Sequence, residues 1–154
     1  MKSYGVAALA ACLILGLGLA ETARCQSRHF QASQRHFEEM ATQASSLSAQ
    51  VDSVAEKNLC NLFTATALAY SIRAHVMAQL TDVADTLRQP EAQALLARKL
   101  AESRAFVTRH LELDLKAVEG LAASSGNAKV RKLGLRLVNE LRVFENNTTS
   151  LAKN

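Results

Sequence analysis

The sequence is poor in residues that interrupt helices. Among 154 residues there is one proline, Pro90, and six glycines, and no glycine lies between residues 19 and 119. A β-sandwich or an α/β fold needs turn residues roughly every 8–12 residues, so these classes are excluded. Tryptophan is absent, and three cysteines are too few for a disulfide-rich scaffold. Alanine and leucine, both strong helix formers, supply 27 and 23 residues, so the composition predicts one all-α domain.

The N-terminal segment is uncharged and apolar. Residues 4–20 carry no charge and follow a single lysine, Lys2. As a helix this run spans roughly 25 Å, less than the ~30 Å hydrocarbon core of a bilayer, and it ends in the small residues that a signal peptidase reads. We expect a signal peptide over residues 1–20, cleaved after Ala20, and a secreted or periplasmic mature protein. The alternatives are an uncleaved anchor and a lipoprotein, because the four residues ending at Cys12 resemble a lipobox.

Apolar residues recur at helical spacing through the rest of the chain. We expect a polar N-terminal tail over residues 21–27 and a single helical bundle domain over residues 28–152. The predicted stops are at Gln89-Pro90-Glu91 and at Ser124-Ser125-Gly126, with Asn127 as the next N-cap. They give helices over residues 53–88, 90–123 and 128–152. Short connections make neighbouring helices antiparallel, so the predicted fold is an up-and-down bundle.

The segment before residue 52 has the clearest heptad pattern. We define its apolar residues as the association seam: Phe37, Met40, Ala44, Leu47, Val51 and Val54. Asp52, Ser53 and Glu56 have the spacing of a capping box and indicate a helix boundary nearby. We expect residues 28–51 to fold back as a fourth helix, because monomers rarely leave such a stripe uncovered. The alternative is a coiled-coil stalk that joins other chains through the seam.

The apolar lines of the three later helices predict the core. They are Leu62, Ala65, Ala69, Ile72, Val76, Leu80, Val83 and Leu87; then Leu96, Leu100, Val107, Leu111, Leu115, Val118 and Leu121; then Val130, Leu133, Leu137, Leu141 and Phe144. Small residues such as Ala65, Ala69 and Ala101 leave room inside such a bundle. A carrier of a small apolar ligand, or of haem bound through His75, is therefore an alternative function.

Two cysteines, Cys25 and Cys60, remain after the predicted cleavage. A disulfide needs Cα atoms within about 7 Å, whereas one straight helix from residue 25 to residue 60 would separate them by about 52 Å. An internal disulfide therefore requires a chain reversal near Ser45–Ser48. Otherwise the thiols are free or join two chains.

Catalytic and metal-binding patterns are missing from the sequence. There is no Gly-x-Ser-x-Gly, no phosphate-binding glycine loop and no Cys-x-x-Cys. No histidine follows a carboxylate by three residues, as di-iron bundles require. His36 with Glu39 and His110 with Asp114 have one-face spacing, which we interpret as surface ion pairs rather than metal ligands. We expect a protein that is not an enzyme and that uses no cofactor or metal.

Positive charge is concentrated in the last predicted helix. Residues 128–154 hold six basic and two acidic side chains. Its basic residues are Lys129, Lys132 and Arg136, spaced for one helical face, with Arg131 and Arg142 beside it. They predict a docking face for an acidic partner, an anionic membrane or a sulfated glycan; the alternative is a solvated face. Nucleic acid is not an expected partner, because no aromatic residues interleave with the charges.

Overlapping glycosylation sequons begin at Asn146 and Asn147, in a segment that we expect to fray. A eukaryotic source would place one glycan there. With no catalytic pattern and a long heptad pattern, the sequence favours an exported, non-enzymatic helical bundle that acts through protein–protein interaction or self-association.

Overall fold

The computed structural model describes residues 4–87 and 89–150, with side chains from residue 26 onward except that of residue 85. It contains four helices: α1 (Tyr4–Ser48), α2 (Val54–Thr86), α3 (Pro90–Ser124) and α4 (Ala128–Ser150). The described residues include no strand. The all-α four-helix bundle is therefore confirmed, and each short connection lies where the turn residues predict it.

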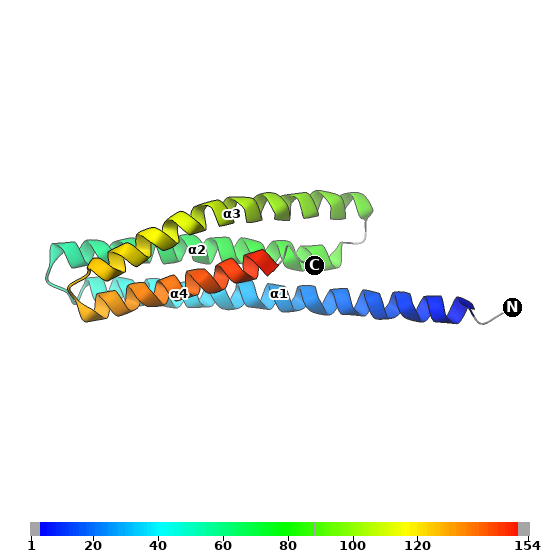
Figure 1. The fold of residues 1–154 in the computed structure, drawn as a ribbon, viewed down its shortest axis with the longest axis horizontal. Helices are drawn as coiled ribbons and strands as arrows, with labels where there is room; N and C mark the ends of the chain where they lie inside the picture. Colours follow the sequence, from blue (N-terminus) through cyan, green and yellow to red (C-terminus); the bar gives the residue numbers. More distant parts are fainter. Residues whose placement is uncertain (1–3, 88, 151–154) are drawn as a thin grey trace.

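Successive helices run antiparallel (Figure 1). α1 packs against α2 and α4, α3 packs against the same two helices, and α2 and α4 touch across the diagonal. The later half of α1 thus folds back onto the bundle, and the alternative of a projecting stalk is wrong. The association seam lies in the core instead of on a surface: Phe37, Met40, Ala44 and Val51 are buried and Leu47 packs against them, while Val54 is 72% exposed.

α1 begins earlier than expected, so residues 21–27 are helical and do not form an irregular tail. Hydrogen bonds set its register against α2: Ser48 donates to Asn61 over 3.0 Å, and Gln34 Oε1 lies 3.1 Å from the ring of His75. In this register Thr86, the last residue of α2, lies beside residue 23. The first part of α1 consequently extends past the ends of the other helices (Figure 1). Among the described residues, no helix is both long and apolar enough to cross a membrane.

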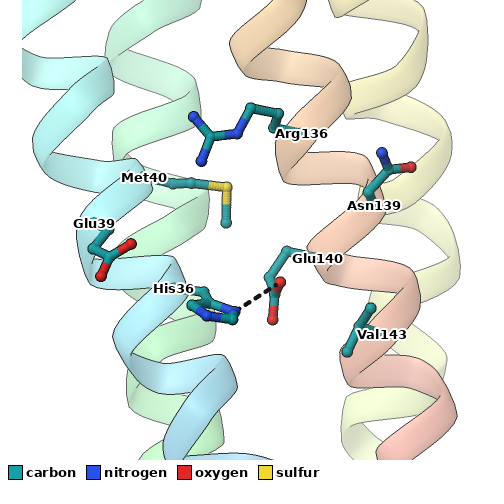
Figure 2. Close-up of a pocket in the computed structure, with 7 residues that line it drawn as sticks. All are labelled: His36, Glu39, Met40, Arg136, Asn139, Glu140 and Val143. Atoms are coloured by element: carbon teal, nitrogen blue, oxygen red, sulfur yellow. Dashed lines mark hydrogen bonds and ion pairs between the residues drawn. The ribbon is translucent and has the colours of Figure 1, made fainter.

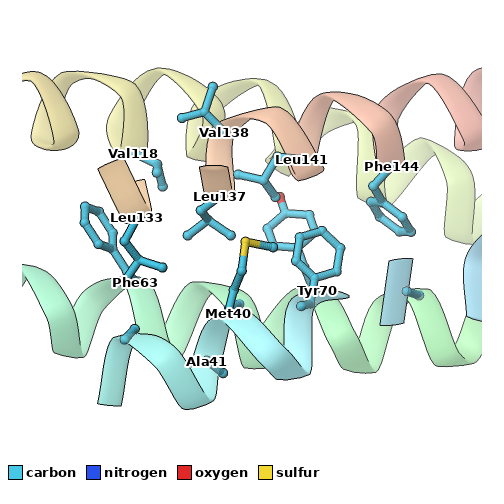
Figure 3. Close-up of a cluster of buried hydrophobic side chains, with 14 of the residues drawn as sticks. Met40, Ala41, Phe63, Tyr70, Val118, Leu133, Leu137, Val138, Leu141 and Phe144 are labelled. Carbon is cyan, nitrogen blue, oxygen red and sulfur yellow. The ribbon is translucent and has the colours of Figure 1, made fainter. Parts of the chain in front are cut away.

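Aromatic side chains are the largest groups in the core, and Figure 3 shows Phe63, Tyr70 and Phe144 among aliphatic residues. Phe144 of α4 packs edge-on against Phe30, Phe37 and Tyr70, with ring centroids 5.8–5.9 Å apart. Such edge-to-face pairs add about 0.5–1.5 kcal/mol each beyond the area that they bury. All five apolar residues predicted for α4 are buried, as are Val107, Leu111 and Val118 of α3. The core prediction is confirmed for α4. For α3 it is confirmed in part, because Leu100, Leu115 and Leu121 are only partly buried against the core and Leu96 is half-buried.

The predicted core line of α2 is wrong. The residues that face the core form a different heptad line, which we call the inner line of α2: Cys60, Phe63, Ala67, Tyr70, Ala74, Met77 and Thr81. Within the predicted line, Leu62, Ile72 and Val83 are 43%, 65% and 45% exposed. The large aromatic groups decide the orientation, because a helix rotated to bury the aliphatic line would leave Phe63 and Tyr70 in water.

A glycine allows α4 to approach its neighbours closely. Gly134 is buried, and a Cβ added there would lie 2.6 Å from the Cβ of Ala122 and 2.8 Å from the ring of Phe63. Gly120, in the exposed part of α3, has nothing within 4 Å of the same point. The absence of a side chain at Gly134 is therefore a packing requirement.

One carboxylate, that of Glu56, joins α2 to the α3–α4 connection. It lies at the end of the bundle that also holds the α1–α2 connection. Glu56 accepts hydrogen bonds from the hydroxyl of Ser125 over 2.8 Å and from the amides of Gly126 and Asn127 over 3.0 and 3.2 Å. Asn127 caps α4 as predicted, through its side-chain oxygen and the amide of Lys129. The predicted capping box is wrong, because Glu56 binds the α3–α4 connection and Ser53 makes no side-chain cap.

Candidate interaction surface

The outward side of α2 carries a second, exposed heptad line. We call it the outer face of α2, and it consists of eight positions at alternating spacings of four and three: Asn58, Leu62, Ala65, Ala69, Ile72, Val76, Gln79 and Val83. All eight residues are exposed, and none carries a charge. From residue 58 to residue 83 the line spans about 38 Å of helix.

Neighbouring apolar residues widen this face. Leu68 is 47% exposed beside it. Near the end of α2, Val76, Leu80 and Val83 line a shallow hollow of about 400 Å³ together with Gln79 and Asp82. Single exposed apolar residues are ordinary on protein surfaces, but a continuous apolar strip is typical of an interaction site.

The charged side chains described on α2 lie beside the outer face. By helical spacing Lys57 and Asp82 share the flank of His75, which meets Gln34 of α1, and Asp82 also borders the hollow. On the flank next to α3, the Arg73 guanidinium lies 4.4 Å from the centre of the Tyr70 ring and 3.5 Å from Asp114. These contacts hold His75 and Arg73 against neighbouring helices, so neither side chain covers the eight uncharged positions between the two flanks.

Tyr70 is the polar centre of the core. Its hydroxyl donates to Asp114 over 2.8 Å, while its ring is fully buried. Burial raises the pKa of Tyr70 well above its usual value, and the hydrogen bond to Asp114 raises that pKa further. The phenol therefore stays neutral, and its hydrogen bond to Asp114 connects α2 to α3. The predicted pairing of His110 with Asp114 is wrong: Asp114 contacts Tyr70 and Arg73, and the His110 ring lies 4.4 Å from that of Phe106.

A groove between α1 and α4 brings polar residues together (Figure 2). His36 lies 3.2 Å from Glu140 of α4, and the predicted pairing of His36 with Glu39 is therefore wrong. Glu39, Met40 and Arg136 also line the groove, which measures about 350 Å³. In the part of the chain that the structure describes, no three histidine, cysteine or acidic residues are grouped to hold a metal ion.

The basic residues of α4 lie on two sides of the helix. Arg136 donates to Gln43 of α1 over 2.8 Å, whereas Arg142 forms a 3.0 Å ion pair with Glu119 of α3. Lys129, Arg131 and Lys132 are exposed near the start of α4. Among the described residues these three form no ion pair within 4 Å. Arg136 and Arg142 thus point toward different neighbouring helices, and the docking face that Lys129, Lys132 and Arg136 would form stays a prediction.

Cys60 and the sequon residues Asn146 and Asn147 lie within the described part of the chain, whereas the Cys25 side chain does not. Cys60 is a free, fully buried thiol, and burial, followed by the charge of Glu56, raises its pKa. Residue 60 lies near residue 48 in the helix register, about 35 Å along α1 from residue 25, which is too far for an internal disulfide. The Cys25 side chain lies outside the described residues, so a bond from Cys25 to a second chain stays a prediction. The segment holding Asn146 and Asn147 is helical to Ser150 and does not fray. Asn146 is exposed, and its glycosylation stays a prediction.

The residues that suggested a carrier of a small apolar ligand or haem do not lie inside the bundle. Ala65, Ala69 and Ala101 are all exposed, so these small residues leave no room inside the bundle. His75, the residue considered for haem, is exposed as well.

Six of the eight residues in the outer face of α2, all except Asn58 and Gln79, belong to the line that the sequence predicts for the core. The missed signal was a second heptad line containing Phe63, Tyr70 and Met77, which competes with the aliphatic line for burial. No family model, curated protein or solved structure matches this chain.

Proposed function

We propose that this protein is an exported, non-enzymatic helical bundle that acts through protein–protein contact, with the outer face of α2 as its contact surface. The observation that supports this function is the row of eight exposed, uncharged positions along α2. Burial of apolar surface contributes about 25 cal/mol per Å². A partner that covers this strip therefore gains affinity from its apolar side chains, and none of the eight residues of the strip carries a charge.

Export is supported by the register of α1. Residue 23 lies beside the end of α2, so cleavage after Ala20 would remove the part of α1 that extends past the bundle. The helix pairing would stay intact. Measurement of the intact mass of the native protein tests this: we expect a species that begins at Glu21, and a species that retains residues 1–20 would contradict export by cleavage.

A pair of matched variants tests the contact surface. Ile72 in the outer face of α2 is 65% exposed, and Leu113 on α3 is 64% exposed. We expect Ile72→Glu to lower recovery of the native binding partner at least about tenfold, because a buried, unpaired carboxylate is costly at an interface. Leu113→Glu should leave recovery unchanged. Equal recovery with both variants would contradict the proposed function.

Anionic surfaces are a second candidate partner, favoured by Lys129, Arg131 and Lys132. These cations are exposed at the N-terminal, electropositive end of α4. We expect co-sedimentation with vesicles containing phosphatidylserine, and its loss at high salt because the attraction is screened. Reversal of Lys129 and Lys132 to glutamate should abolish sedimentation, whereas the ion-paired Arg142→Glu should change it less. Binding that persists in high salt would contradict this candidate.

A further inference from the structure

We propose that the outer face of α2 binds the same face of a second copy, with the two α2 helices antiparallel about a twofold axis. This inference rests on the proposed function and names the partner. The axis passes between the turns that carry Ala69 and Ile72. Twofold dimers are the commonest soluble oligomers, and their interfaces must be self-complementary.

The spacing of the face is symmetric about its centre. The intervals between its eight positions alternate as four and three residues, and the series begins and ends with four. It therefore reads the same in both directions. When two copies run antiparallel, residue 69 faces residue 72 of the second copy, residue 65 faces 76, residue 62 faces 79 and residue 58 faces 83. Every a position of the heptad then meets a d position, as antiparallel helix pairs require.

Side-chain sizes match in this arrangement. At the two central levels Ala69 faces Ile72, and at the next two Ala65 faces Val76. Each small residue meets a β-branched residue, so the width of the helix pair stays constant along its centre. A parallel arrangement would place Ile72 against Ile72 and Ala69 against Ala69, which gives alternately wide and narrow levels. Interfaces pack to the density of protein interiors, so the antiparallel arrangement is favoured.

The charges beside the strip also fit an antiparallel pair. Lys57 and Asp82 are exposed on the same flank, near opposite ends of the face. In an antiparallel pair equal flanks meet, so Lys57 of one copy faces residue 84 of the other and lies within one helical turn of its Asp82. The twofold axis repeats this pairing at both ends. Charge pairs at the edge of an interface help to set the relative orientation of the two chains and add little affinity.

The size of the contact predicts a reversible dimer. One helix per copy, in contact over about 38 Å, is smaller than the surface of an obligate dimer. We therefore expect a dissociation constant of the order of 10 μM. The free bundle remains folded, because the inner line of α2 holds its core without help from the second copy.

Analytical ultracentrifugation of the intact protein and of two variants tests the dimer. The native protein should sediment as a monomer–dimer equilibrium. Ile72→Glu should weaken dimerisation at least about a hundredfold, because the twofold axis introduces the carboxylate twice. The matched Leu113→Glu should change it less than about twofold, and circular dichroism should show the same helicity in all three. A native protein that is monomeric well above 10 μM, or an Ile72→Glu variant that still dimerises, would overturn the inference.

Cysteine crosslinking tests the orientation independently of stability, with Cys12 and Cys25 replaced by serine. A mixture of Ala65→Cys chains and Val76→Cys chains should form a disulfide heterodimer, because these positions face each other. Ala65→Cys alone should not, since its two copies lie about 16 Å apart along the axis, too far for a disulfide. Crosslinking of Ala65→Cys with itself, without the heterodimer, would indicate parallel chains and overturn the antiparallel arrangement.

The outcomes also separate this inference from the proposed function. The native protein could stay monomeric while Ile72→Glu, but not Leu113→Glu, loses a native binding partner. In that case the inference of a dimer is wrong, and the outer face of α2 remains the proposed contact surface. If neither dimerisation nor partner recovery responds to Ile72→Glu, both the inference and the proposed function fail.

Discussion

Two helical glycines have opposite surroundings, and this difference predicts opposite effects of the same substitution. Gly134→Ala forces a methyl group to within 2.6 Å of the Cβ of Ala122, in the closely packed part of α4. We expect it to lower the free energy of unfolding by about 1–2 kcal/mol despite the better helix propensity of alanine. Gly120→Ala meets no neighbour within 4 Å and should raise the free energy of unfolding by about 0.5–1 kcal/mol.

Denaturant unfolding followed by circular dichroism measures both changes. Stabilisation by both substitutions would show that α4 does not need its close approach at Gly134.

Also at the residue scale, the buried phenol of Tyr70 predicts loss of stability at alkaline pH. Its pKa is raised in the folded protein, so the native state keeps a proton that the unfolded chain releases above about pH 10. The contribution of Tyr70 to stability is therefore complete below that pH and decreases as the pH rises. Tyr70→Phe should flatten this alkaline decrease while lowering stability at neutral pH by about 1 kcal/mol, through loss of the hydrogen bond to Asp114.

Urea unfolding at a series of pH values checks the Tyr70 prediction. If the free energy of unfolding of Tyr70→Phe decreases as steeply at alkaline pH as that of the native protein, other groups cause the decrease.

At the scale of elements, Glu56 connects α2 to the α3–α4 connection. We expect Glu56→Ala to lower the free energy of unfolding by about 2 kcal/mol, because it removes an ionised acceptor shared by Ser125, Gly126 and Asn127. Asp52→Ala is the matched control: it removes an exposed carboxylate from the same end of the bundle and should change stability by less than about 0.5 kcal/mol. Equal effects in thermal unfolding would contradict the anchoring role of Glu56.

The helices themselves were predictable from the sequence, and the orientation of one of them was not. Pro90 and Asn127 mark helix starts by local backbone chemistry, and α4 has one apolar stripe facing one way. α2 has two heptad lines, and periodicity alone cannot choose between them. The choice depends on tertiary contacts of Tyr70 with Phe37, Phe144 and Asp114, which come from three other helices.

The candidate site was missed for the same reason. Leu62, Ile72 and Val83 look like core residues in the sequence, and they become a surface only once Phe63 and Tyr70 occupy the core. Conversely, the association seam around Phe37 and Met40 looks like an intermolecular contact and lies inside the bundle instead. The basic residues of α4 are exposed, and the contacts of Arg136 with Gln43 and of Arg142 with Glu119 depend on neighbouring helices that periodicity does not reveal.

At the scale of the whole molecule, the four helices bury their core residues without a partner. They still leave exposed the uncharged outer face of α2, which is about 38 Å long. We expect the outer face of α2 to be covered when the protein functions. Thiol labelling tests it most directly, with Ile72→Cys compared to Leu113→Cys in a background with Cys12 and Cys25 replaced by serine. Cys60 will not interfere, because it is buried and its pKa is raised.

The predicted result is that labelling of Ile72→Cys slows at least about tenfold as protein concentration passes about 10 μM, while labelling of Leu113→Cys keeps its rate. Equal labelling rates at the two positions, at every concentration and in the presence of the native extracellular fraction, would contradict the claim.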